Sequence, residues 1–224
     1  MNKSIFVACD VSSHKEILEL LSKIHEEISG IKIGLQYITN HSPQEIRELS
    51  KFNKPIFYDG KFFDIKNTLV ESVKSLQYLD IKFATVHLLN GLDALKAANE
   101  AANNINVKLL GVSVLTSFDN EELEQLGFKE QLDKQVLRLI KIADEAKLYG
   151  VICSPLEIKM IKKVAPSLKC FTPGIRQDKN KNDQKRTMNA KQALEAGSDC
   201  LIIGRPITKG DPKKNIQEIL SSLN

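Results

Sequence analysis

The chain has 224 residues, of which 42% are hydrophobic and 27% are charged. This composition is ordinary for a globular protein and excludes collagen-like, low-complexity and largely disordered chains. The 32 Lys and Arg residues outnumber the 28 Asp and Glu residues slightly, for a net charge of +4, and they are spread along the chain. Because aromatic residues make up only 6% and Trp is absent, the composition does not favour a nucleic-acid partner.

The cysteines and the N-terminal segment bear on the cellular compartment. Cys9, Cys153, Cys170 and Cys200 form no C-x-x-C pair and have no zinc-like spacing, so we expect buried, reduced thiols and no metal site. The first apolar run, Ile5–Cys9, is too short for the core of a signal peptide. No run approaches the roughly 18 apolar residues of a membrane span. We therefore expect a cytoplasmic protein with no membrane partner.

Short apolar runs alternate with amphipathic stretches along the chain. The runs are rich in Ile and Val and apolar on both faces, which is typical of strands in a buried parallel sheet. Apolar spacing predicts helices over residues 16–24 and 132–143, and an alanine-rich stretch predicts another over 94–102. The predicted strands are Ile5–Cys9, Ile31–Gly34, Pro55–Tyr58, Phe83–His87, Leu109–Leu115, Val151–Cys153, Leu168–Thr172 and Cys200–Ile203.

The number of alternations predicts the fold. About eight strand–helix units without a Pro-, Gly- or Ser-rich linker indicate a single-domain (β/α)8 TIM barrel over residues 1–224. A doubly wound open sheet is the structural alternative. The dinucleotide-binding pattern G-x-G-x-x-G follows none of the predicted strands, which makes this alternative less favourable.

Polar residues follow almost every predicted strand, and in a barrel these positions surround one mouth, where active sites lie. The motif Asp59-x-Lys61-x-x-Asp64 follows the third strand, and Lys32 is a charge inside the apolar second strand. In an extended chain Asp59 and Lys61 face the same side, and Asp59 could also pair with Lys32, which predicts an alternating Lys32–Asp59–Lys61–Asp64 array. Flanking carboxylates would keep Lys61 protonated and able to give a proton to a forming carbanion. A cluster of surface ion pairs explains the motif equally well.

Two later segments indicate an anion site. Gly204 and Arg205 follow the eighth predicted strand, where a glycine lets a backbone N–H approach an anion and an arginine can bind it through two hydrogen bonds. A plain turn with a surface arginine is the alternative. The polar segment 176–187 is long for a barrel loop. We interpret it as a mobile loop, a lid at the mouth whose basic residues would attract an anionic substrate, with a solvated connector as the alternative.

These segments together resemble the orotidine 5′-phosphate decarboxylase family. The resemblance runs through essentially the whole chain, and its segments occur in the family's order. The segments that carry it are Ala8–Asp10, Ile31–Gly34, Asp59–Thr68, Thr85–His87, Val114–Ser117, Gly150–Ser154, Thr172–Arg176, Asp183–Arg186 and Ile203–Thr208.

The resemblance implies a homodimeric barrel that converts orotidine 5′-phosphate to UMP and CO₂ without a cofactor, in pyrimidine biosynthesis. It implies that Lys61 is the proton donor to C6 of the pyrimidine and that Asp59 lies against the substrate carboxylate. Lys32 would complete the charge array. Asp64 would reach into the neighbouring subunit's site.

The resemblance also implies a set of substrate-binding residues. Asp10 would bind ribose hydroxyls, and Thr116 would lie near the base. The phosphate would be bound by Gln184, Gly204 and Arg205. Ile65 and Thr68 would lie beside Asp64 at the neighbouring site. Pro173 and Arg176 complete the set, and Arg176 begins the mobile loop. Lys66 stands where the family usually has Pro, so the turn after Asp64 is expected to be less rigid.

Three other functions are weighed against this one. A magnesium-dependent decarboxylase of a keto-sugar phosphate also carries D-x-K-x-x-D, but it would need an acidic ligand at the end of the second strand, where this chain has Gly34. A non-catalytic nucleotide-binding barrel would bind UMP without turnover. A nucleic-acid-binding module is disfavoured by the dispersed charge. His87 follows the fourth strand, and we interpret it as a packing residue.

Overall fold

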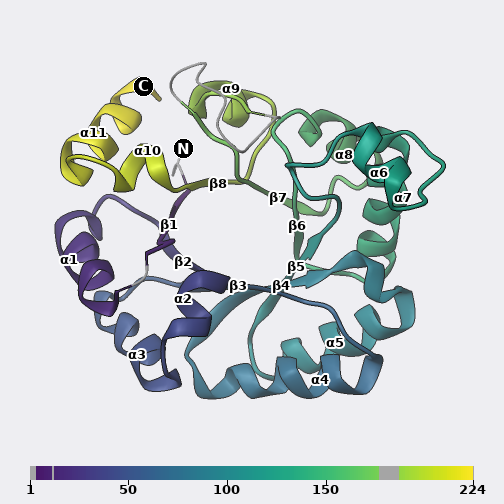
Figure 1. The fold of residues 1–224 in the computed structure, drawn as a ribbon, viewed down its shortest axis with the longest axis horizontal. Coiled ribbons are helices and arrows are strands. Elements are labelled where there is room, and N and C mark those ends of the chain that lie inside the picture. Colours follow the sequence, from purple (N-terminus) through teal and green to yellow (C-terminus); the bar gives the residue numbers. More distant parts are fainter. Residues whose placement is uncertain (1–3, 12, 177–186, 224) are drawn as a thin grey trace.

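The computed structural model describes residues 4–11, 13–176 and 187–223. Within these residues eight parallel strands close into a barrel in chain order, with helices around the outside (Figure 1). The predicted (β/α)8 fold is therefore confirmed, and the open-sheet alternative is excluded. The strands are β1 (Ile5–Ala8), β2 (Gly30–Gly34), β3 (Ile56–Phe62), β4 (Ile81–His87), β5 (Lys108–Val112), β6 (Gly150–Ile152), β7 (Lys169–Thr172) and β8 (Cys200–Ile203).

Closure is visible at β1, which pairs in parallel on both of its edges. Val7 lies opposite Ile31 of β2 and opposite Ile203 of β8. All eight predicted strands are present; β4 starts two residues earlier than predicted, β3 and β5 differ most in length, and the others agree to within one residue at each end. β3 continues to Phe62 instead of ending at Tyr58, and β5 ends at Val112, because the chain turns away from the sheet before Leu115.

Helices form the outer ring, and the three predicted ones are confirmed as α1, α5 and α7 with small differences at their ends. α1 packs through Ile17, Leu20, Leu21 and Ile24, the apolar face that its spacing predicts. None of the helices in the described ranges is long and apolar enough to cross a membrane. The helices are α1 (His14–Ile24), α2 (Leu35–Asn40), α3 (Pro43–Glu48), α4 (Lys66–Ser75), α5 (Leu92–Asn104), α6 (Asn120–Gln125), α7 (Leu132–Glu145), α8 (Ile158–Val164), α9 (Ala190–Glu195), α10 (Arg205–Thr208) and α11 (Pro212–Ser222).

Aromatic side chains fill the barrel below its mouth. Phe6 makes edge-to-face contacts with Phe57, Phe83 and Phe171, with ring centroids 5.6 to 6.5 Å apart. Since side chains alternate along a strand, a residue two positions further along points into the same interior, one layer nearer the mouth. Asp59, Thr85 and Pro173 occupy such positions after three of these phenylalanines. The aromatic layer is therefore the floor of the site.

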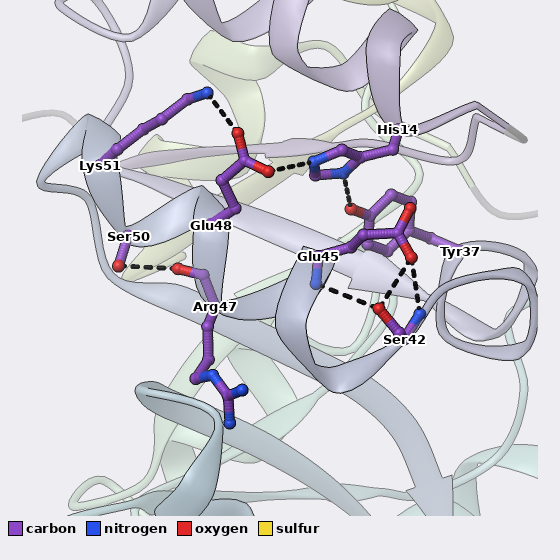
Figure 2. Close-up of polar contacts among 8 residues, drawn as sticks. All are labelled: His14, Tyr37, Ser42, Glu45, Arg47, Glu48, Ser50 and Lys51. Atoms are coloured by element: carbon purple, nitrogen blue, oxygen red, sulfur yellow. Dashed lines mark hydrogen bonds and ion pairs between the residues drawn. The ribbon is translucent and has the colours of Figure 1, made fainter.

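A polar cluster joins α1, α2 and α3 (Figure 2). Nδ1 of His14 lies 2.6 Å from the Tyr37 hydroxyl, and Nε2 of His14 lies 3.0 Å from a carboxylate oxygen of Glu48. Since a carboxylate only accepts, Nε2–H of His14 donates to Glu48, and Nδ1 shares a hydrogen bond with the Tyr37 hydroxyl. Tyr37 is fully buried and stacks on His41 with centroids 4.1 Å apart. Burial, followed by nearby carboxylates, raises the pKa of Tyr37, so its hydroxyl stays protonated.

We expect Tyr37→Phe to lower the free energy of unfolding by about 1–2 kcal/mol, because the ring is kept while Nδ1 of His14 loses its buried hydrogen-bond partner. Urea denaturation followed by circular dichroism measures this loss. Tyr78→Phe is a suitable control, since the Tyr78 side chain is 65% exposed. Equal losses in both variants would contradict the assignment.

Candidate active site

The centre of the site is a buried ion pair between neighbouring strands. Lys32 on β2 and Asp59 on β3 point into the barrel, and Nζ of Lys32 lies 3.4 Å from Oδ2 of Asp59. Nζ of Lys32 also lies 3.1 Å from Oδ1 of Asp10, at the end of β1. Lys32 is only 8% exposed, so these two carboxylates compensate a charge that is largely withdrawn from water.

The electrostatics of the pair keep both groups ionised. Burial alone would lower the pKa of Lys32, but the Asp59 and Asp10 carboxylates outweigh it and raise that pKa above its ordinary value. Burial would likewise raise the pKa of Asp59, but Lys32 and Lys61 outweigh it and lower that pKa. The site therefore holds a fixed carboxylate between two ammonium groups at neutral pH.

Lys61 reaches this carboxylate from an unusual backbone conformation. The sequence predicts plain extension from Asp59, but Lys61 has a φ of 48°, and the pairing of β3 with β4 shifts register between Tyr58 and Phe62. A left-handed conformation costs a non-glycine residue about 1–2 kcal/mol. The Lys61 N–H donates to the Thr85 hydroxyl on β4 at 2.8 Å, which holds the bulge in place. The side chain still points back to Asp59 as predicted, with Nζ 2.9 Å from Oδ1.

Gly34, at the end of β2, is needed for this arrangement. A Cβ added there would lie 2.8 Å from Oδ1 of Asp10 and 3.2 Å from Nζ of Lys32. No side chain fits at this position without displacing the ion pair. An acidic ligand at this position, as the magnesium-dependent alternative requires, would therefore disrupt the array.

The charged groups open into a cavity of about 200 Å³ at the mouth of the barrel. Lys32, Asp59 and Lys61 form one side, Thr116 and Pro173 lie among the other lining residues, and the rest is mainly apolar. The Lys61 side chain is one-third exposed, so a ligand in the cavity can contact it. The predicted site residues Lys61 and Thr116 therefore line the same cavity. The apolar lining consists of Val112, Val114, Leu115, Ile152 and Ile202.

A second cavity, of about 540 Å³, adjoins the first and shares Lys32, Pro173 and Ile202 with it. Its lining contains the predicted Asp10 and three residues expected near the phosphate, Arg176, Gly204 and Arg205, together with Gly174, which was not predicted. Arg205 is the first residue of α10 and follows Gly204 directly. The mouth therefore runs from the Asp/Lys array to a basic end, a span that suits a ligand with an anionic group remote from its reacting part.

The remaining predicted residues are not part of these cavities. Asp64, Ile65 and Thr68 are exposed at the start of α4. Among the described residues, the Asp64 carboxylate forms no ion pair, and its Oδ1 accepts from the Ile65 N–H at 2.7 Å. Within one chain the array is therefore Asp10–Lys32–Asp59–Lys61. Gln184 and most of the predicted mobile loop 176–187 lie outside the described residues.

Sequence analysis missed one inward-facing polar residue, Thr85. It is fully buried, and its hydroxyl lies 3.0 Å from Oδ1 of Asp59. Its position two residues after Phe83 on an inward face was the available signal. Nδ1 of His87 accepts from the Leu89 N–H at 3.3 Å, and the ring contacts Phe63, in keeping with packing. Burial, and then Lys61, lower the pKa of His87.

No group of three or more His, Cys, Asp or Glu side chains suited to a metal occurs in the described part of the chain. The fold and the site define a class: a (β/α)8-barrel protein with a buried Asp/Lys array beside a basic end of the mouth. The family model described as "Orotidine 5′-phosphate decarboxylase / HUMPS family" matches residues 3–219. The chain belongs to this family, as its motifs predicted, and is an enzyme of the carboxy-lyase class.

Individual relatives agree with this assignment. Proteins named orotidine 5′-phosphate decarboxylase from Wolbachia pipientis subsp. Culex pipiens and from Lawsonia intracellularis are each 37% identical to the chain, over 98% of both sequences. The crystal structure of orotidine 5′-phosphate decarboxylase from Lactobacillus acidophilus superimposes with a TM-score of 0.87 at 32% identity, and it covers 100% of both chains. The similarity therefore extends over the whole barrel.

Proposed function

We propose that the chain decarboxylates orotidine 5′-phosphate to UMP and CO₂. The observation that carries the proposal is the Lys61 ammonium, held 2.9 Å from a buried carboxylate in a cavity that continues to a basic end. The substrate has the matching shape: a reacting pyrimidine and a phosphate several bonds away. The names of the relatives support the same substrate.

The two cavities suggest how the substrate binds. The phosphate would lie at Gly204 and Arg205, with Arg176 and Gln184 contributing from the loop. Asp10 would accept hydrogen bonds from the ribose hydroxyls. The pyrimidine would then fill the smaller cavity beside Thr116, with its carboxylate against Asp59 and its C6 toward Lys61.

The chemical step uses groups of this chain alone. The bond between C6 and the carboxylate carbon breaks, CO₂ leaves, and the electron pair stays on C6. An N–H of the Lys61 ammonium gives its proton to C6, and the neutral amine later regains a proton from water. The ammonium is already in place before charge develops on C6, so its stabilisation requires little reorganisation. The ionised Asp59 would lie beside the substrate carboxylate, and their repulsion would favour loss of CO₂.

The proposal is tested by the fall in absorbance when orotidine 5′-phosphate is added to the pure protein in excess EDTA. Because no step requires a metal or cofactor, we expect full turnover. No turnover of orotidine 5′-phosphate, together with Mg²⁺-dependent decarboxylation of a keto-sugar phosphate that EDTA abolishes, would favour the keto-sugar decarboxylase alternative. Folded protein that binds UMP but releases no CO₂ would favour a non-catalytic binding barrel.

We further propose that a second copy of the chain completes the site, at the start of α4. Phe63 and Ile65 are 62% and 75% exposed there, an unusual exposure for large apolar side chains beside a mouth. Asp64 and Thr68 lie next to them, where a neighbouring site could use them. Sedimentation at assay concentration should give the mass of a dimer. The free, buried cysteines suit the reducing cytoplasm, where we expect the reaction to occur.

A further inference from the structure

Thr85 is a buried polar residue with two hydrogen bonds to the charge array. It lies in the middle of β4, between the buried Ala84 and Val86. A hydroxyl has one hydrogen to donate and can accept as well. The Thr85 hydroxyl accepts from the Lys61 backbone N–H at 2.8 Å and donates to Oδ1 of Asp59 at 3.0 Å. The Thr85 hydroxyl thus accepts one hydrogen bond and donates another within the site.

These bonds close a ring of contacts around Lys61. The same Oδ1 of Asp59 that accepts from Thr85 also accepts from Nζ of Lys61 at 2.9 Å. Thr85 therefore acts on Lys61 at both ends: directly at its backbone N–H, and through Asp59 at its ammonium. Regular sheet pairing does not hold the backbone of Lys61, because β3 is bulged between Tyr58 and Phe62.

The backbone of Lys61 makes this support necessary. Its φ of 48° is a conformation that residues with side chains adopt rarely, and it persists only where neighbouring groups hold it. Without an acceptor, the N–H would favour a return to regular extension. The Cα–Cβ direction, and with it the path of the side chain, would then change.

We propose that Thr85 is a positioning residue for Lys61, and that its hydroxyl sets the place of the ammonium that protonates C6. The inference rests on the proposed decarboxylation for its kinetic consequence, but its structural part does not. Thr85 does not itself touch the reacting atoms in this assignment. Its hydroxyl acts through Lys61 and Asp59.

The first test compares Thr85→Val with Thr85→Ser. Valine keeps the shape and lacks the hydroxyl, so we expect kcat to fall by about 10- to 100-fold, as for loss of a hydrogen bond to a charged group. Serine restores the hydroxyl, and we expect kcat within about threefold of the wild type. Affinity for UMP should change by less than about threefold in both variants, because the phosphate end is untouched. Should the valine variant not fold, Thr85→Ala against Thr85→Ser gives the same comparison.

A second measurement is independent of the reaction. Hydrogen exchange of the Lys61 amide in ligand-free protein should accelerate by at least about tenfold in Thr85→Val and stay unchanged in Thr85→Ser. Ser198→Ala is a matched control, since it also removes a buried hydroxyl, one that donates to Thr172 away from the array at 2.8 Å. It should leave both kcat and Lys61 exchange unchanged.

The outcomes separate the two proposals. Unchanged Lys61 exchange in Thr85→Val, or equal kcat in the valine and serine variants, overturns the positioning role. Wild-type protein without decarboxylase activity overturns the proposed reaction, and amide exchange then still decides whether Thr85 holds Lys61. A loss of kcat in Ser198→Ala as large as in Thr85→Val would assign the effect to general loosening of the barrel and overturn the inference.

Discussion

Replacing Lys61 by alanine is expected to lower kcat for orotidine 5′-phosphate by at least about 10⁴-fold, because one side chain supplies both the proton and the charge facing the carbanion. Lys32, the other lysine of the array, cannot replace it, because Lys32 is 8% exposed and paired with Asp59 and Asp10. The loss should appear in kcat, since the phosphate end that dominates binding is unchanged. Absorbance assays at saturating substrate measure it.

The control for this variant is another ion-paired lysine. Lys169 begins β7, at the end of the barrel opposite the mouth, and its Nζ lies 3.0 Å from Asp199. Lys169→Ala should keep kcat within about twofold of the wild type. Lys61→Ala should also still bind UMP. A Lys61→Ala enzyme with more than about one-hundredth of wild-type kcat would remove Lys61 from the role of proton donor.

Replacing Arg205 by alanine is expected to weaken UMP binding by about 10²- to 10⁴-fold. Arg205 begins α10 beside Gly204 at the basic end of the mouth, where two charge-assisted hydrogen bonds to a phosphate are together worth about 3–6 kcal/mol. Since phosphate binding is remote from C6, kcat should fall as well, because remote binding energy is used to orient the pyrimidine. Competitive inhibition by UMP measures the first effect.

A comparison with uridine tests whether Arg205 acts on the phosphate of UMP. It lacks the phosphate, so its inhibition constant should be the same for the wild type and Arg205→Ala. Arg138→Ala serves as the arginine control, because Arg138 is an exposed residue of α7 paired with Glu130. If uridine and UMP weakened equally in Arg205→Ala, the arginine would be acting on the shape of the mouth and not on a phosphate.

Much of the fold follows from local pattern. Eight Ile- and Val-rich runs predicted eight strands, because a parallel strand buried on both faces must be apolar throughout. Lys32 could be predicted as a site residue for the same reason, since a charge within such a run needs a buried partner. Its bond to Asp10 was not predicted, because the pair with Asp59 already gave the Lys32 charge a partner and the sequence does not show that the strand on its other side supplies a second carboxylate.

The backbone conformation of Lys61 could not be predicted from the sequence pattern. Alternation predicts the direction of a side chain only while the backbone stays extended, and at Lys61 a hydroxyl from the next strand replaces the regular pairing. The left-handed backbone is thus a tertiary effect, invisible in the sequence around Asp59. Roles that depend on a second chain, such as those of Asp64, Ile65 and Thr68, stay predictions for a similar reason.

The aromatic layer beneath the charge array has a kinetic consequence. With Phe6 and its three neighbouring rings filling the interior, the Asp/Lys array has no route to solvent through the bottom of the barrel. In the proposed reaction, CO₂ and UMP must then leave by the same opening through which a new proton reaches the Lys61 amine. A new catalytic cycle therefore requires both product release and reprotonation of Lys61 through this one opening before the next substrate fills it.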